Sequence, residues 1–149
     1  MRILCVGKLK ESWQRDACRE YEKRISRFEK AEICEVDDCP ETDPRAMEKE
    51  GEALLSRLKD GDMLVALTLD GEMVDSEGLA KKYGQWRQTG RRVCFAIGGS
   101  LGLSGDVTAR AEHKLCLSKM TFPHALARVI LLEQLYRAHM ILAGSRYHK

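Results

Sequence analysis

Short, strand-like and mostly apolar segments alternate with helical segments along this chain, and this alternation restricts the folds open to it. The apolar segments are residues 2–7, 31–37, 62–69, 92–97 and 114–118. Strands without polar alternation are buried on both faces, and strands that alternate with helices form parallel sheets. The sequence therefore predicts an α/β fold, with a parallel sheet and helices on both of its faces.

Between the predicted strands, apolar residues recur with helical spacing, as in residues 10–28. Pro44 suits the first turn of a helix that runs to about residue 58. Asp75 or Ser76 can cap a further helix, and Ser104 can cap a short one. The Asp70-Gly71 pair is expected to end the third strand as a turn. A length of 149 residues without a linker or repeat predicts a single domain, 1–149.

The six cysteines show no Cys-x-x-Cys pair. Four fall inside predicted strands, namely Cys5, Cys34, Cys94 and Cys116. A free thiol in a strand packs as a small apolar group. No histidine lies near Cys34 and Cys39 to complete a zinc site. We therefore expect free cysteines and no bound metal.

The longest apolar stretch, residues 125–143, is interrupted by charged side chains and does not read as a membrane span. The apolar run at residues 3–6 is too short for a signal peptide, so we expect a cytoplasmic protein. Net charge is only +2, but residues 91–149 hold nine cations and three anions. A basic field of this kind suits a polyanion such as RNA, although alone it is a weak signal.

Three predicted strand ends meet at one edge of the sheet, at residues 67–70, 97–99 and 117–122. Ligands of parallel α/β sheets bind outside the carboxyl ends of the strands. The glycines of Gly98-Gly99-Ser100-Leu101-Gly102 let the backbone approach a ligand closely. The segment lacks the Lys-Ser/Thr of a P-loop and the Gly-x-Gly-x-x-Gly spacing, which disfavours nucleoside triphosphates and dinucleotides.

The last helix, which starts at Pro123, has no single polar face. At 100° per residue, Arg128 and His139 fall near one angle, and Glu133 and Arg137 fall almost opposite. Such a helix is buried on more than one side, and we expect a second subunit to cover one of them. Glu133 and Arg137 are spaced to form an ion pair along the helix.

Several motifs together resemble the RlmH family, bacterial SPOUT-superfamily methyltransferases that modify N3 of a pseudouridine in 23S ribosomal RNA. The motifs are FAIGGSLGL at residues 95–103, LSKMTFPH at 117–124, LLEQLYRA at 131–138 and the final Tyr-His-Lys. The resemblance implies a C-terminal trefoil knot, a homodimer, S-adenosyl-L-methionine as cofactor and no metal. It also implies an rRNA partner, and we expect the substrate to be the assembled ribosome, because a chain this small has little surface for finding one nucleotide in free RNA.

The family's site residues carry over onto matching positions. The donor-binding set is Leu67, Gly98, Leu117, Ser118, Lys119, Met120, Thr121 and Phe122. In the tail, His148 is the candidate base and Tyr147 a candidate for stacking on the target base. Arg146 and Lys149 are candidate contacts to RNA phosphates. Whether the tail completes its own site or the partner's is left open by the sequence.

Two other classes of function stay open at this point. A non-catalytic RNA-binding module would use the basic segments and leave the glycine turn as a structural feature. A small hydrolase would use His148 or His124, but the chain has no Gly-x-Ser-x-Gly elbow. Binding of S-adenosyl-L-methionine separates the methyltransferase from both.

Overall fold

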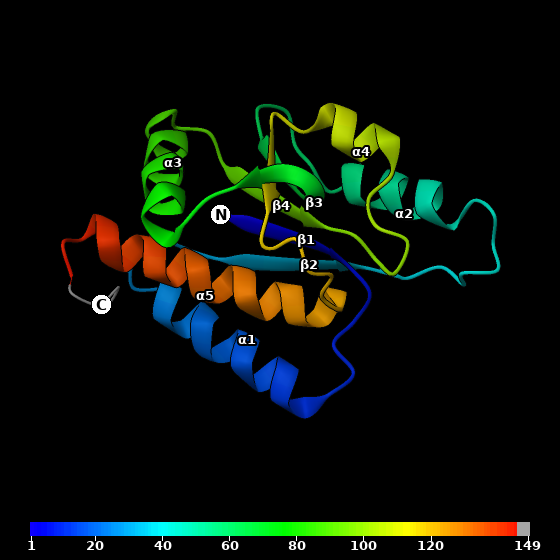
Figure 1. Cartoon of the computed structure of the whole chain (residues 1–149), viewed down its shortest axis with the longest axis horizontal. Coiled ribbons are helices and arrows are strands. Elements are labelled where there is room, and N and C mark those ends of the chain that lie inside the picture. Colours follow the sequence, from blue (N-terminus) through cyan, green and yellow to red (C-terminus); the bar gives the residue numbers. More distant parts are fainter. Residues whose placement is uncertain (146–149) are drawn as a thin grey trace.

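The computed structural model describes residues 1–145, which form a parallel sheet with helices on both faces (Figure 1). The strands are β1 (Arg2–Val6), β2 (Glu32–Val36), β3 (Met63–Met73), β4 (Val93–Ile97) and β5 (His113–Cys116). Their order in the sheet is β2-β1-β4-β3-β5, and every neighbouring pair is parallel. The predicted α/β class with a parallel sheet is confirmed.

The helices are α1 (Ser12–Ile25), α2 (Ala46–Leu55), α3 (Ser76–Gln88), α4 (Gly105–Arg110) and α5 (His124–Leu142). Helices α1, α3 and α5 cover one face of the sheet, and α2 and α4 cover the other (Figure 1). Two of the expected caps are present: Asp75 accepts from the Gly78 amide at 2.7 Å, and Ser104 accepts from the Val107 amide at 3.4 Å. These bonds satisfy amides that the first turn of a helix leaves unpaired.

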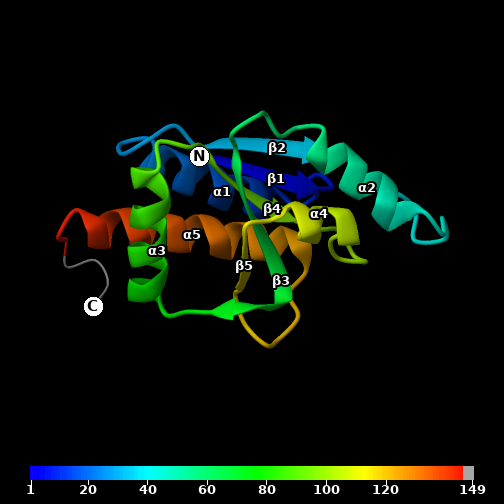
Figure 2. The ribbon, with the colours of Figure 1, turned by 90° about the horizontal axis from the view of Figure 1, so that it is seen from above.

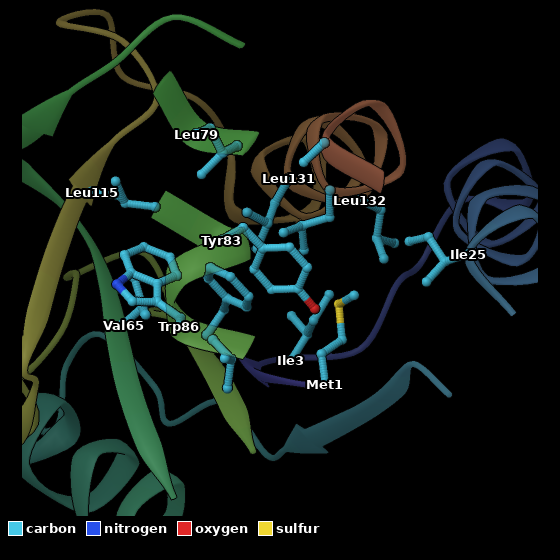
Figure 3. Packing of buried hydrophobic residues seen from close by; sticks show 14 of the residues in the cluster. Met1, Ile3, Ile25, Val65, Leu79, Tyr83, Trp86, Leu115, Leu131 and Leu132 are labelled. Atoms are coloured by element: carbon cyan, nitrogen blue, oxygen red, sulfur yellow. The ribbon is translucent and has the colours of Figure 1, made fainter. Parts of the chain in front are cut away.

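Strands β1 to β4 each contribute to two hydrophobic clusters, because successive side chains point to opposite faces. In β1, Ile3 belongs to the cluster under α1, α3 and α5, and Leu4 belongs to the cluster under α2 and α4. Figure 3 shows Tyr83 and Trp86 of α3 beside Leu131 of α5 in the larger cluster. Burial of both faces explains why the strands show no polar alternation.

Helix α5 lies between α1 and α3 and packs against both (Figure 1). The expected contact of α5 with a second subunit stays a prediction. Arg128 and His139 both point inward and are buried. On the other side of α5, Arg137 donates to Glu133 at 2.7 Å, which confirms the expected pair.

Strand β3 continues past Asp70 to Met73, so the predicted turn at Asp70-Gly71 is wrong. The register with β5 shifts along β3, and Leu115 pairs with both Leu67 and Glu72. A Cβ on Gly71 would lie 2.5 Å from the carbonyl carbon of Leu115, so glycine permits this close crossing. Figure 2 shows the second half of β3 passing β5 on its way to α3.

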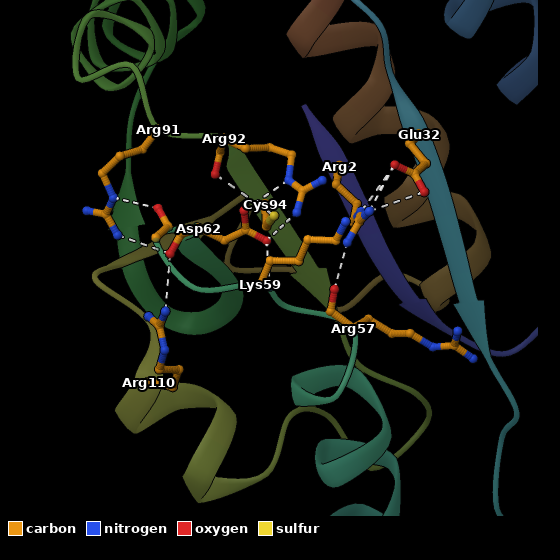
Figure 4. A network of polar contacts seen from close by, with 10 residues as sticks. Arg2, Glu32, Arg57, Lys59, Asp62, Arg91, Arg92, Cys94 and Arg110 are labelled. Carbon is orange, nitrogen blue, oxygen red and sulfur yellow. Dashed lines mark hydrogen bonds and ion pairs between the residues drawn. The ribbon is translucent and has the colours of Figure 1, made fainter.

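A buried carboxylate, Asp62, organises the amino end of β3 (Figure 4). Its two oxygens accept from Arg92 Nε at 3.0 Å and Nη2 at 2.7 Å, and Oδ2 also accepts from the Lys59 amide at 2.9 Å. Arg91 and Arg110 donate to its backbone oxygen at 3.0 and 3.1 Å. One acidic residue thus fixes three arginines at the edge of the sheet opposite the strand carboxyl ends.

We expect Asp62→Ala to lower the free energy of unfolding by about 2–3 kcal/mol, because the Arg92 charge loses its buried partner. Denaturant unfolding measures the effect. Asp60→Ala is the matched control, since Asp60 is exposed two residues away. A loss below about 1 kcal/mol for Asp62→Ala would show that water replaces the carboxylate at little cost.

Glu29 is the centre of a second polar cluster beneath α3 and α5. Tyr83 Oη donates to Glu29 Oε1 at 2.5 Å, and His139 Nε2 lies 3.3 Å from the same oxygen. The Met1 amino group donates to Oε2 at 2.6 Å. Burial raises the pKa of Glu29, but the interactions with His139, the Met1 amino group and Tyr83 outweigh it and lower the pKa to about 2.

This shift predicts a pH dependence of stability. A carboxyl with a lowered folded pKa contributes stability that is present above its unfolded pKa, near 4.5, and lost as pH falls toward 2. We expect Glu29→Gln to lose about 3 kcal/mol at pH 7, and the difference from the unmodified chain to vanish near pH 2. Unfolding free energies measured across this range test it; a constant difference at every pH would contradict it.

Candidate functional site

A cleft of about 900 Å³ opens at the carboxyl ends of β3, β4 and β5. Its walls are formed by residues 67–70, 97–103, 115–118 and 120–124, with Thr108 and Ala127. These are the strand ends that the sequence analysis expected to converge. The lining is largely apolar side chains and exposed backbone, which suits a flat, uncharged group with hydrogen-bonding edges.

The glycine turn after β4 can only be built with glycine at its first position. A Cβ on Gly98 would lie 2.3 Å from the Gly102 carbonyl oxygen and 2.8 Å from the Leu103 nitrogen. The turn is closed by the Gly102 amide, which donates to the Gly99 oxygen at 3.1 Å. Gly102 has a φ of +87°, a conformation that favours glycine. The cleft floor is therefore backbone with no side chain over it.

Glu50 of α2 supports this turn from behind, and the sequence analysis missed it. The residue is buried, and its Oε1 accepts from the Cys39 amide at 2.8 Å. Its Oε2 has no partner among the described residues and lies 3.0 Å from the position that a Cβ on Gly99 would take. No sequence signal could identify it, because an acidic residue in a helix is usually exposed.

The loop after β5 forms the opposite wall. The Met120 amide donates to Ser118 Oγ at 3.0 Å, and Cys116 Sγ donates to the Ser118 oxygen at 3.0 Å, so the loop is held by local bonds. Three apolar side chains at the mouth stay exposed: Leu69 at 65%, Leu101 at 48% and Met120 at 68%. Exposed apolar side chains around a cleft are typical of a binding site.

Asp70 adds a negative charge at the rim of this cleft. Its interactions with Thr68 and then with Lys114, which lies 3.3 Å away, lower the pKa of its carboxyl. His124, at the start of α5, also lines the cleft, and its Nε2 lies 3.3 Å from where a Cβ on Gly7 would be. Among residues 1–145, His124 forms no ion pair with a carboxylate of the kind that orients a catalytic histidine in a hydrolase.

All predicted donor-binding residues except Lys119 line the cleft, namely Leu67, Gly98, Leu117, Ser118, Met120, Thr121 and Phe122. The cleft also takes in Ala127 of α5, which the sequence analysis did not single out. The other predicted residues, Arg146, Tyr147, His148 and Lys149, lie outside the described residues.

Within the described part of the chain, no group of three His, Cys, Asp or Glu residues could hold a metal ion. In the same part, no helix has the length and apolar character needed to cross a membrane. All six cysteines are free thiols. Burial raises the pKa of Cys5 to about 12 and that of Cys94 to about 11, which makes these thiols unreactive.

A parallel sheet with a cleft at its carboxyl edge is the arrangement of an α/β protein that binds a ligand outside its strand ends. The chain matches the family model described as "Predicted SPOUT methyltransferase" over residues 1–148. It therefore belongs to the SPOUT methyltransferase family, whose members transfer a methyl group from a donor.

Similar proteins agree with this assignment. The chain is 50% identical over 155 residues to the ribosomal RNA large subunit methyltransferase H of Bifidobacterium animalis subsp. lactis, covering 99% of this chain and 98% of that one. It is 46% identical, with the same coverage, to the protein of that name from Ruminiclostridium cellulolyticum. Among solved structures, a probable methylase family protein from Haemophilus influenzae has a similar fold, with a TM-score of 0.53 and 11% identity over 96% of this chain and 66% of that chain.

Proposed function

We propose that this chain transfers the methyl group of S-adenosyl-L-methionine to N3 of a pseudouridine in 23S ribosomal RNA, on the assembled ribosome. The observation that carries the proposal is the glycine-floored cleft, which lies where the family's donor-binding motifs fall. The names of the relatives supply the substrate class. A ribosomal substrate implies activity in the cytoplasm.

The cleft fits the proposed donor in size and chemistry. Leu67, Leu117 and Phe122 offer apolar surfaces for an adenine ring. The backbone at Gly98 and at residues 118–121 offers hydrogen-bonding groups to the edge of the base and to the ribose. When bound, the donor would supply an electrophilic methyl group on a sulfonium centre. The chain's task is then to hold the target ring in line and to remove its N3 proton.

The N3–H of a uracil-type ring must lose its proton as the nitrogen attacks the methyl carbon and the carbon–sulfur bond breaks. We assign His148 as the base that takes this proton, because imidazole changes its charge near neutral pH. Tyr147 would stack on the extruded base, and Arg146 and Lys149 would contact neighbouring phosphates.

We infer that these tail residues serve the cleft of a partner chain, because α5 ends far from the cleft of its own chain. The cleft lies at the start of α5, and the 19 residues of the helix carry the chain ~28 Å to the opposite end of the molecule (Figure 1). From Ser145, residue 148 reaches at most ~11 Å further. We therefore propose a homodimer in which the tail of each chain completes the cleft of its partner.

The trefoil knot is also part of the proposal. Threaded chains are rare in proteins, so this part of the proposal rests on the resemblance to the family.

The decisive experiment is transfer of radiolabelled methyl from S-adenosyl-L-methionine to ribosomes that lack the modification, followed by nucleoside analysis of the 23S RNA. We expect N3-methylpseudouridine with assembled ribosomes and much less with protein-free RNA. Equal labelling of free RNA would refute the assembled substrate. A non-catalytic RNA-binding module or a hydrolase would bind no donor in calorimetry, and that result would overturn the methyltransferase itself.

A further inference from the structure

A second concavity, the α1–α5 pocket, lies beside the cleft and is assigned no role by the proposed methyl transfer. It has a volume of about 280 Å³ and is lined by Leu9, Cys18 and Ile33 as its apolar surfaces. It neighbours the main cleft through α5, because Arg128 lines the pocket and His124, one turn earlier, lines the cleft.

A buried arginine forms one side of the pocket. Arg128 is 1% exposed, and it donates to Glu35 Oε1 at 2.5 Å and to the Gly7 oxygen at 2.8 Å. Its Nε is buried and has no hydrogen-bond partner among residues 1–145. An N–H group in this state costs free energy unless a ligand or water satisfies it. Arg128 thus lines the pocket with a fixed positive charge and with one N–H group that the described residues leave unpaired.

The other polar groups of the pocket decide what kind of ligand fits. Glu22 and Glu35 place carboxylates in the same lining, so a bare anion would be repelled. A bare cation would meet Arg128, Arg15 and Arg19. A neutral, flat group with both N–H and carbonyl edges satisfies both charge types and packs on the apolar surfaces. Nucleobases have this combination.

We propose that the α1–α5 pocket receives an unpaired nucleobase of the RNA, next to the base that is methylated. The proposal rests on the proposed function for its substrate. Arg15 is fixed at the rim by its bonds to the Leu9 oxygen at 2.9 Å and the Lys10 oxygen at 2.7 Å, and Arg19 lies exposed one turn along α1. Both are placed to contact the phosphates on either side of an inserted nucleotide.

The test measures binding of 70S ribosomes without donor. Ile33→Trp fills the pocket, and we expect it to weaken ribosome binding at least about tenfold, in line with the loss of one stacked base. Ile33→Val keeps the pocket open and is the matched control, expected within about twofold of the unmodified chain. Donor affinity should be unchanged in both variants, which separates a blocked pocket from a misfolded chain.

A second pair of variants shows whether the pocket holds a nucleobase or a phosphate. Glu22→Ala removes an acceptor for base N–H groups, and we expect weaker ribosome binding, by about threefold or more. If the pocket held a phosphate, the same change would strengthen binding, because it removes a negative charge. Lys23→Ala, exposed at the next position of α1, controls for the helix.

Ribosome binding by Ile33→Trp equal to that of Ile33→Val, or stronger binding by Glu22→Ala, would overturn the nucleobase pocket and leave methyl transfer untouched. Absence of methyl transfer by the unmodified chain would overturn the proposed function, while the binding assay would still report on the pocket. Absence of any ribosome binding would overturn both.

Discussion

Gly98→Ala is expected to abolish donor binding while leaving the sheet folded. The added Cβ would lie 2.3 Å from the Gly102 oxygen, and that atom belongs to the backbone of the same closed turn. The turn must open to admit the methyl group, which displaces the cleft floor. Forcing a side chain into filled space costs about 1–3 kcal/mol, so we expect donor affinity to fall at least about tenfold. Calorimetric titration with S-adenosyl-L-methionine measures it.

Gly105→Ala is the matched control for this change. Gly105 begins α4 a few residues after the turn, and a Cβ there meets nothing within 4 Å. We expect donor affinity within about twofold of the unmodified chain, and stability equal or slightly higher, because alanine favours helix. Equal donor binding by Gly98→Ala and Gly105→Ala would show that the turn does not form the donor site.

Loss of the tail is expected to have the largest effect on turnover. Deletion of residues 146–149 should leave donor binding intact, since the cleft residues all precede them. It should lower kcat about 100-fold or more, the contribution typical of a positioned base. His148→Ala alone should reproduce most of this loss in single-turnover methylation, and His148→Ala with an unchanged rate would remove the base assignment.

A mixing experiment shows whose cleft the tail serves. Chains that lack residues 146–149 are combined with Gly98→Ala chains, each inactive alone. If tails act across a dimer, a heterodimer holds one intact cleft together with one intact tail, and part of the activity returns. If confirmed heterodimers stay inactive, the tail acts on its own chain, and the distance along α5 must be closed by another rearrangement.

The alternation of apolar and helical segments was sufficient to predict the sheet, because a strand that is buried on both faces needs apolar residues at successive positions. Strand β4, residues 93–97, is apolar throughout and fully buried. The glycine turn was also predictable, since it follows a strand end and lacks side chains. Seven of the predicted donor residues line one cleft for this reason.

Other features depend on contacts between distant residues and leave no local signal. The crossing of β3 over β5 depends on Gly71 meeting Leu115, 44 positions along the chain, and the sequence analysis had placed a turn there. The burial of Glu50 behind the glycine turn also depends on distant residues, because it is set by the packing of α2 against the sheet.

The sequence by itself determined the fold class, the edge of the sheet that carries the site and most of the donor cleft, because burial and turn chemistry act on neighbouring residues. Only the tertiary structure decided that Arg128 lines a second pocket, with an Nε that has no partner among residues 1–145, and that α5 separates the cleft from the residue where the tail begins. Both follow from how α5 packs between α1 and α3, and packing partners far apart in sequence are not encoded in any local pattern.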